Sequence, residues 1–286
     1  PVNSQGQPNG NAILCHVRAN ITSLVTGDAV IYQTIENTGI VTACHTRKNV
    51  LERPDSKGDV KAMAANIDQL VIVTAPEPAF HPELVDRYLV ATEVSNIKPL
   101  IVINKGDLMN DSDVITKYLL TEKKLYESLG YLVVGTTIKE ADGLTELSNH
   151  LMNKSSVFIG QSGVGKSSLV QALLPSENIR VGHLHKQTRL GRHITSTARL
   201  FPFKGGGSII DSPGVRNFGL GQISRSDLDF GFIDIRKFAV NCRFRDCRHR
   251  YESGCAVLDA AQQGRLSKRR LESFQRILDT LNGGNA

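Results

Sequence analysis

A glycine-rich run between an apolar stretch and a helix-like stretch carries the clearest chemistry in the sequence. It has the spacing G-x-x-x-x-G-K-[ST]. Glycines let successive backbone N–H groups point into one concavity, and the N-terminus of a following helix adds donors, so such a loop cradles phosphates. Lys166 would reach the β- and γ-phosphates, and the Ser167 hydroxyl would ligate Mg²⁺. The candidate contacts are Gly160, Gln161, Ser162, Gly163, Val164, Gly165, Lys166, Ser167 and Ser168.

A second motif, Asn104-Lys105-Gly106-Asp107, indicates which base is bound. Guanine presents its N1–H and its exocyclic amino group side by side, and the Asp107 carboxylate can accept from both, whereas adenine lacks that pair of donors. Lys105 can lay its aliphatic stem over the base, and Asn104 can tie this loop to the glycine-rich loop. A backbone N–H near Thr137, in the pair Thr136-Thr137, could donate to guanine O6. Together with the glycine-rich loop, this motif predicts binding of GTP and GDP.

The run Asp211-Ser212-Pro213-Gly214 completes the phosphate end of the predicted site. It follows a short apolar stretch that reads as a strand. We expect Asp211 to act through the water shell of Mg²⁺, and the Gly214 N–H to approach the γ-phosphate. The following segment could then sense whether that phosphate is present.

A polar segment at residues 186–197 has the composition of a mobile switch loop, in which Thr195 could ligate Mg²⁺ in the GTP state. Val215 stands where Ras-type proteins place a water-orienting glutamine, so we expect slow intrinsic hydrolysis. His193 is the candidate that assists the attack of water, although an RNA contact or a simple surface position would also suit it.

The C-terminal part of the chain contains Cys242-x4-Cys247-x-His249-x5-Cys255. Three thiolates and one imidazole form a complete tetrahedral set, which predicts one structural Zn²⁺. Clustered cysteines with a histidine also indicate a reducing compartment rather than disulfides. Arginines crowd the same segment, and residues 222–286 hold 12 Lys/Arg against 8 Asp/Glu, out of a net charge of +6 for the whole chain. This local excess favours a contact with RNA over a uniformly basic surface.

An alternating α/β pattern positions the nucleotide motifs. Apolar runs predict strands at 69–74, 99–103, 131–134, 156–159 and 208–211, and amphipathic stretches predict helices at 82–94, 112–129, 144–152 and from 169. Such a pattern implies a parallel, doubly wound sheet, with ligands at the carboxyl ends of its strands.

The two ends of the chain read differently from this centre. Short β-type runs at 12–18, 28–34 and 39–45 predict a small barrel; an oligonucleotide-binding (OB) barrel, an SH3-like barrel or a β extension without a ligand all fit. Residues 54–59 resemble a linker. A helix expected over 267–281 carries Lys268, Arg269 and Arg270 off its apolar stripe. The resulting division is 1–56, 57–221 and 222–286, and the absence of an 18-residue apolar run predicts no membrane span.

The base-reading loop precedes the phosphate loop, which is the reverse of the order in Ras-like proteins, so the same site requires a circularly permuted chain. The order small barrel, NKxD, GxxxxGKSS, GRHxT, DSPG, CxxxxCxHxxxxxC resembles the circularly permuted ribosome small subunit-dependent GTPase A family (RsgA, also called YjeQ), over nearly the whole chain. Two details depart from that family: Ile194 replaces a threonine of the switch run, and Thr136-Thr137 replaces Ser-Ser or Ser-Ala.

The resemblance implies an OB-type N-terminal domain, a permuted GTPase domain and a mainly helical zinc-binding C-terminal domain. It further implies GTP hydrolysis stimulated by the small ribosomal subunit, during late maturation of that subunit, through binding of its rRNA in the bacterial cytoplasm. We expect a monomer. Two alternatives remain open on the residues alone: an RNA-binding scaffold in which the nucleotide is structural, and a GTPase that serves another RNA, such as tRNA.

Overall fold

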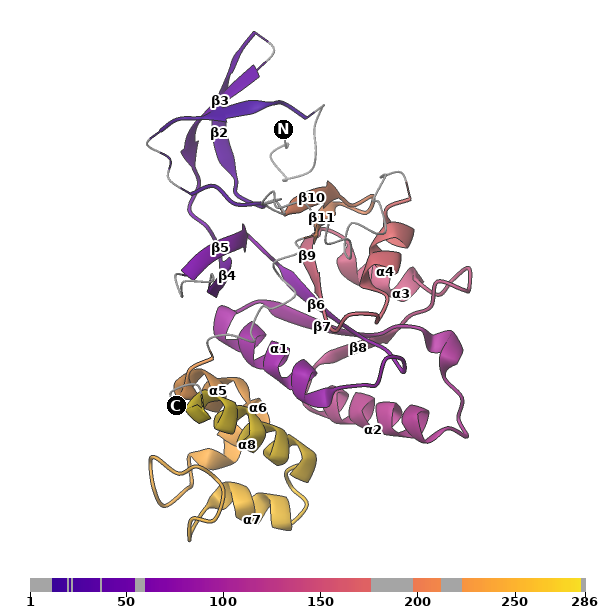
Figure 1. Cartoon of the computed structure of the whole chain (residues 1–286), viewed down its shortest axis with the longest axis vertical. Helices are drawn as coiled ribbons and strands as arrows, with labels where there is room; N and C mark the ends of the chain where they lie inside the picture. The colour runs from indigo at the N-terminus through magenta and orange to yellow at the C-terminus, as the bar shows by residue number, and fades with distance from the viewer. Residues whose placement is uncertain are drawn as a thin grey trace, which may run out of the picture.

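The computed structural model describes residues 12–19, 21, 23–36, 38–54, 60–175, 198–211 and 223–283. Its centre is a six-stranded sheet with the order β10-β11-β9-β6-β7-β8 (Figure 1). The parallel strands are β6 (Gln69–Thr74), β7 (Lys98–Ile103), β8 (Leu132–Gly135), β9 (Lys154–Ile159) and β11 (Gly207–Asp211). The predicted parallel sheet is therefore confirmed. The predicted roles of His193, Thr195 and Gly214 fall outside the described residues.

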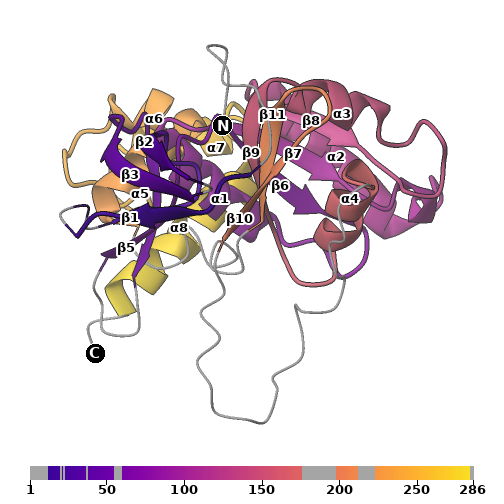
Figure 2. The ribbon, with the colours of Figure 1, turned by 90° about the horizontal axis from the view of Figure 1, so that it is seen from above.

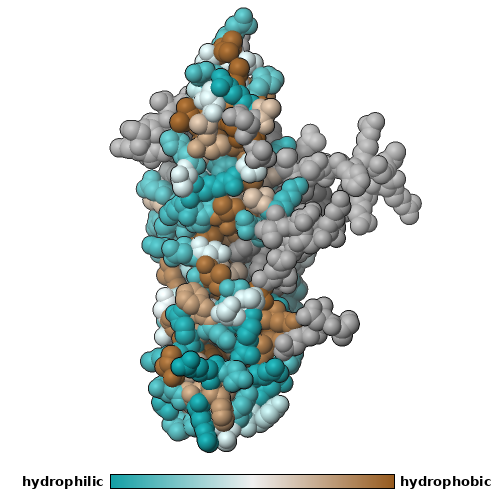
Figure 3. Space-filling model, turned by 90° about the vertical axis from the view of Figure 1, so that its left-hand side faces the viewer, coloured by the Kyte–Doolittle hydropathy of each residue, from teal (hydrophilic) through white to brown (hydrophobic). Residues whose placement is uncertain are grey.

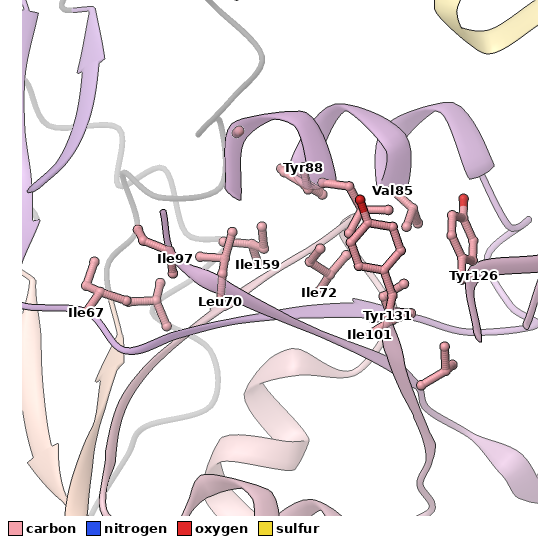
Figure 4. Packing of buried hydrophobic residues seen from close by; sticks show 14 of the residues in the cluster. Ile67, Leu70, Ile72, Val85, Tyr88, Ile97, Ile101, Tyr126, Tyr131 and Ile159 are labelled. Carbon is pink, nitrogen blue, oxygen red and sulfur yellow. The ribbon is translucent and has the colours of Figure 1, made fainter. Parts of the chain in front are cut away.

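Helices cover both faces of this sheet, because each strand sends alternate apolar side chains to opposite sides. In β6, Leu70 and Ile72 join the cluster under α1 and α2 (Figure 4), whereas Val71 and Val73 join the cluster under α3 and α4. The helices are α1 (Pro82–Ser95), α2 (Val114–Ser128), α3 (Thr145–Leu151) and α4 (Lys166–Leu173). Strands buried on both faces account for the continuous apolar runs in the sequence.

Local signals set the ends of these helices. Pro82 opens α1, and Asn96 ends it in the left-handed conformation. The side chain of Asp113 accepts a hydrogen bond from the Thr116 N–H and so caps α2. The helix expected from residue 169 begins earlier, at Lys166, directly after Gly165. The last residues of the glycine-rich motif therefore belong to the helix itself, and this places its unpaired N–H groups at the loop.

The antiparallel edge strand β10 (Arg199–Pro202) does not appear among the predicted strands. It pairs with β11 on one side only and is largely exposed, so it lacks the continuous apolar run that marks the central strands.

The N-terminal region holds a three-stranded sheet and a separate hairpin. The sheet has the order β1-β3-β2 and contains β1 (Cys15–Val17), β2 (Val30–Ile35) and β3 (Thr38–Cys44). The hairpin pairs β4 (Val50–Pro54) with β5 (Val60–Ala65). The segment expected to be a linker thus lies between two paired strands, and Leu51 and Ala64 join the apolar cluster under α1. A closed barrel and a boundary at residue 56 remain predictions.

The C-terminal region is mainly helical, as expected. Its helices are α5 (Arg225–Gly231), α6 (Ile233–Ala239), α7 (Ala256–Gln262) and α8 (Lys268–Gly283), and they share an apolar cluster of their own. Two of them, α5 and α8, pack against α1 (Figure 1, Figure 2). Arg270, expected off the apolar stripe, is fully buried. Within the described residues, no helix is both long and apolar enough to cross a membrane.

Candidate nucleotide site and metal cluster

The sequence motifs meet at one edge of the sheet because the parallel strands end in register. Thr74 of β6 lies opposite Ile103 of β7, which lies opposite Gly135 of β8. On the other side, β6 pairs with β9 up to Ile159, and β11 pairs with β9. The loops that follow these strands therefore gather at their carboxyl ends, the usual ligand-binding edge of an open parallel sheet.

The glycine-rich loop has positive φ at three glycines, Gly160, Gly163 and Gly165, and at the first and last of these a side chain would also overlap a neighbouring element. Gly160 has φ +137° and Gly165 has φ +93°, in the region that side chains disfavour. A Cβ at Gly160 would overlap the Val73 carbonyl oxygen, and a Cβ at Gly165 would overlap the Asn104 amide. One overlap involves strand β6 and the other involves the base-reading loop, so the glycines serve the packing of the site as well as its curvature.

Asn104 joins the base-reading loop to the glycine-rich loop, the connection that the sequence predicts. This buried side chain donates from Nδ2 to the Val164 carbonyl oxygen at 2.8 Å. Its Oδ1 accepts from Thr136 Oγ1 at 3.1 Å. One amide thus connects the loops after three strands, β7, β8 and β9, and it fixes the distance between the predicted base end and the predicted phosphate end.

Asp107 lies in the short 3₁₀ turn Gly106–Leu108 and is exposed. The Thr137 hydroxyl donates to its Oδ1 at 2.6 Å, and the Lys139 amide donates to the same hydroxyl oxygen at 3.1 Å. The carboxylate is therefore oriented while it stays accessible to a base. The Thr137 amide donates to Gly143 O at 3.2 Å, which leaves the next amide, that of Ile138, as the candidate donor to guanine O6.

The loop between β6 and α1 forms a wall of the site that the sequence analysis missed. Lys105 Nζ donates to the Glu77 carbonyl oxygen at 2.8 Å. A Cβ placed on Gly163 would contact the ring of Pro78 at 3.4 Å. The available signal was the proline-rich run 76–78 directly after a buried strand, which reads as a turn and carries no motif.

Lys166 and Asp211, the two residues predicted at the phosphate end, come from two different elements. Lys166 Nζ donates to the Gly160 carbonyl oxygen at 2.7 Å and also to that of Gln161. Asp211 is the last residue of β11, beside the strand that leads into the glycine-rich loop. Ser167 is the second residue of α4, next to Lys166.

Four residues of the C-terminal region converge as possible metal ligands. The Cys242, Cys247, His249 and Cys255 ligand atoms all lie within 4.8 Å of one another. Cys242 Sγ is 3.9 Å from Cys255 Sγ, and His249 Nδ1 is 3.4 Å from Cys255 Sγ. A tetrahedral Zn²⁺ with Zn–S bonds of about 2.3 Å would place two sulfurs about 3.8 Å apart. The cluster therefore fits the size of a zinc site.

Burial sets the protonation of this cluster. It lowers the pKa of His249, which favours the neutral, ligating imidazole. It raises the pKa of the Cys247 thiol to about 12. A bound cation would therefore have to displace thiol protons, as metal binding to cysteines does in general.

The loop between these ligands is held by Glu252, which the sequence analysis did not single out. Its carboxylate accepts from the Arg248, Arg250 and Tyr251 amides at 2.8, 2.9 and 3.1 Å. Partial burial opposes ionisation, but these N–H groups lower the pKa of Glu252 to about 2. His249, between two of the donors, takes φ +57°. The loop places His249 at the cluster through this local network.

A parallel sheet, a glycine-rich phosphate loop and an NKxD loop that precedes it in the chain define a P-loop GTPase of circularly permuted order. The family model of the RsgA GTPase matches residues 44–221, a range that includes the β4–β5 hairpin. The chain belongs to the RsgA GTPase family, and it is a GTP hydrolase.

Relatives and solved structures resemble nearly the whole chain. A protein of Ectopseudomonas mendocina named "Small ribosomal subunit biogenesis GTPase RsgA" is 47% identical, with 97% of this chain and 80% of the relative covered. A Hahella chejuensis protein of the same name is 48% identical, with 95% and 78% covered. The structure of YjeQ from Thermotoga maritima matches with a TM-score of 0.74 at 31% identity, and covers 96% of this chain and 91% of that one. The structure of YloQ, described as a circularly permuted GTPase, matches with a TM-score of 0.72 at 30% identity, and covers 96% and 88%.

Proposed function

We propose that this GTPase hydrolyses GTP during maturation of the small ribosomal subunit, and that the subunit stimulates it. The observation that carries the proposal is the link through Asn104, which holds a guanine-type loop and a phosphate loop at a fixed separation. The relatives' names supply the client. We place the chain in the cytoplasm as a monomer, with domains at 1–56, 57–221 and 222–286. The β4–β5 pairing and the family match from residue 44 argue for moving the first boundary toward residue 44.

In the proposed site, Asp107 and Lys105 bind the guanine, and the residues at 160–168 bind the phosphates. Lys166 and the loop amides stabilise charge on the phosphoryl oxygens while water attacks the γ-phosphorus in line. Mg²⁺, when bound with GTP, would neutralise developing charge; Ser167 and Thr195 would ligate it directly, and Asp211 through water. Gly214 would contact the γ-phosphate, and His193 would assist the water.

We propose one structural Zn²⁺ at the cysteine–histidine cluster. The four ligand atoms lie within 4.8 Å of one another, and the Cys242–Cys255 sulfur separation of 3.9 Å is close to that around a tetrahedral ion, so the four residues would fill all four positions. With no position left for water, the ion would stabilise the fold of the C-terminal region rather than take part in hydrolysis.

We further propose that the surface around this cluster contacts rRNA. Exposed rings of the C-terminal region carry an arginine on their face: Arg236 lies 4.5 Å from the ring centroid of Phe230, and Arg243, next to Cys242 in the chain, lies 5.4 Å from that of Phe244. Figure 3 shows that strongly hydrophilic residues surround small hydrophobic patches at the bottom of the face that it views, where the C-terminal helices lie. Arginines paired with exposed rings suit phosphates and unpaired bases.

The test is multiple-turnover phosphate release from GTP, with and without purified small ribosomal subunits. We expect strong stimulation by subunits, no turnover of ATP, and loss of turnover in Lys166→Ala but not in Lys117→Ala, an exposed lysine of α2. In the same assay, His193→Ala should keep GTP binding and lose the stimulation. If subunits leave the turnover unchanged, the small ribosomal subunit is not the stimulating partner. Stimulation by tRNA would identify tRNA as the partner instead. Binding of GTP without turnover would indicate the scaffold alternative.

A further inference from the structure

Helix α1 belongs to two apolar cores. Val85, Tyr88 and Leu89 pack in the cluster on the sheet, whereas Val90 packs in the cluster of the C-terminal helices. The contact on that second side is close: a Cβ added to Gly231 of α5 would lie 2.7 Å from Val90 Cα. The C-terminal region therefore rests on the backbone of α1.

A buried charge cluster joins the same two regions. Asp86 of α1 is fully buried and accepts from Arg270 Nη1 at 2.7 Å, and from Arg269 Nη1. Arg270 also donates to Asp234 of α6, from Nε at 3.0 Å and from Nη2 at 2.7 Å. Glu122 of α2 accepts from Arg269 Nε at 3.0 Å. Arg269 of α8 thus binds α1 and α2, and Arg270 joins α1 to α6.

Because these charged groups are buried, removal of any one of them should strongly weaken the attachment of the C-terminal region to α1. Arg270 and Asp86 have no exposed side-chain surface, and only 4% of the Glu122 side chain is exposed. A buried ion whose partner is removed loses both the attraction and its hydration, so loss of one member costs far more than loss of a surface pair. Arg270 fits this place because its planar group binds two carboxylates at once.

The N-terminal part of α1, which carries Asp86, also borders the predicted nucleotide site. The loop before it carries Glu77 and Pro78, which contact Lys105 and border Gly163. A small cavity is lined by His81, Leu84 and Tyr88 at the start of α1 and, across from them, by Gly160 and Gln161 of the phosphate loop. A shift of α1 would therefore move a wall of the site.

We propose that Arg269 and Arg270 are positioning residues for nucleotide binding: by holding Asp86 they fix α1, and through α1 the loop at residues 75–81 that walls the phosphate loop. The consequence is reciprocal. Attachment of the C-terminal region raises the affinity for nucleotide, and bound nucleotide strengthens the attachment by the same factor. The inference rests on the nucleotide site proposed above and needs no ribosomal subunit for its test.

The experiment measures the Kd of fluorescent GDP, at a temperature well below unfolding, for the full chain and for Arg270→Met. We expect the Kd to rise about fivefold or more in Arg270→Met. Arg270→Lys, which keeps the charge, should restore part of the loss. Lys268→Met is the matched control, because it removes an exposed charge from the same helix, and it should bind like the wild type.

Hydrogen exchange provides a second measurement. Its response to GDP would not differ between the variant and the wild type if the two arginines only stabilised the fold. GDP should slow amide exchange in α8 of the wild type, and this protection should be lost in Arg270→Met. A lower Tm with unchanged Kd and unchanged GDP protection would overturn the proposal. If Arg270→Met does not fold, Asp234→Asn and Glu122→Gln are measured instead, and the same changes in Kd and in GDP protection are expected. A wild type that fails to bind GDP would instead contradict the nucleotide site itself.

Discussion

At the residue scale, the orientation of Asp107 depends on one hydroxyl. Thr137 Oγ1 donates to the carboxylate at 2.6 Å and accepts from the Lys139 amide. The threonine at this position therefore supplies a donor that orients the carboxylate.

Thr137→Val should weaken GTP binding about tenfold, because a hydrogen bond to a charged group is removed without a change of shape. Thr137→Ser keeps the hydroxyl and should bind GTP within about twofold of the wild type. Titration of fluorescent GTP gives both values. A loss in Thr137→Ser with none in Thr137→Val would show that the methyl group matters and the hydroxyl does not.

At the element scale, the loop between the metal ligands owes its shape to Glu252. Its pKa lies at about 2, below the ordinary value near 4.5. A carboxyl whose pKa is lowered by folding contributes stability above its unfolded pKa, and that contribution is lost as the pH falls toward the folded value. The stabilising effect of Glu252 is therefore complete at neutral pH.

Glu252→Gln should release zinc about tenfold faster at neutral pH, as measured with a colorimetric chelator, because an amide accepts these backbone hydrogen bonds more weakly. The stability difference from the wild type should stay constant above about pH 5 and shrink below it. Glu272→Gln changes a carboxylate of the exposed pair with Arg276 and should behave like the wild type. A difference that grows on acidification would contradict the assignment.

At the scale of the whole molecule, the permuted order places the C-terminal helices in the chain after the segment that follows β11. In the tertiary structure, α5 and α8 of this region pack against α1. The fit at Gly231 is tight, since a side chain there meets the backbone of Val90. We expect the seating of the C-terminal region to tolerate little added volume at this point.

Gly231→Ala should lower the stability by about 1–3 kcal/mol through overpacking, which corresponds to a Tm lower by several degrees for a chain of this size. Gly135→Ala is the control, because a Cβ there meets nothing within 4 Å. Scanning calorimetry compares the two variants. An unchanged Tm in Gly231→Ala would show that α5 moves away from α1 without cost.

Local pattern was enough to predict the central architecture. Continuous apolar strands alternating with amphipathic helices indicate a parallel sheet, and such a sheet collects the loops after its strands at one edge. Four metal ligands within fourteen residues needed only a short loop to meet. The edge strand β10 and the β4–β5 hairpin escaped prediction, because their pairing, more than their composition, makes them strands.

The sequence by itself determined the chemistry: the phosphate loop, the guanine-type loop, their permuted order and the cysteine–histidine set each lie in a few neighbouring residues. Only the tertiary structure decided what is buried with what. Arg270 reads as a solvated residue of a basic helix, yet one of its carboxylate partners is 184 positions away. Charge burial depends on contacts between residues that are distant in the chain, and a local pattern carries no information about them.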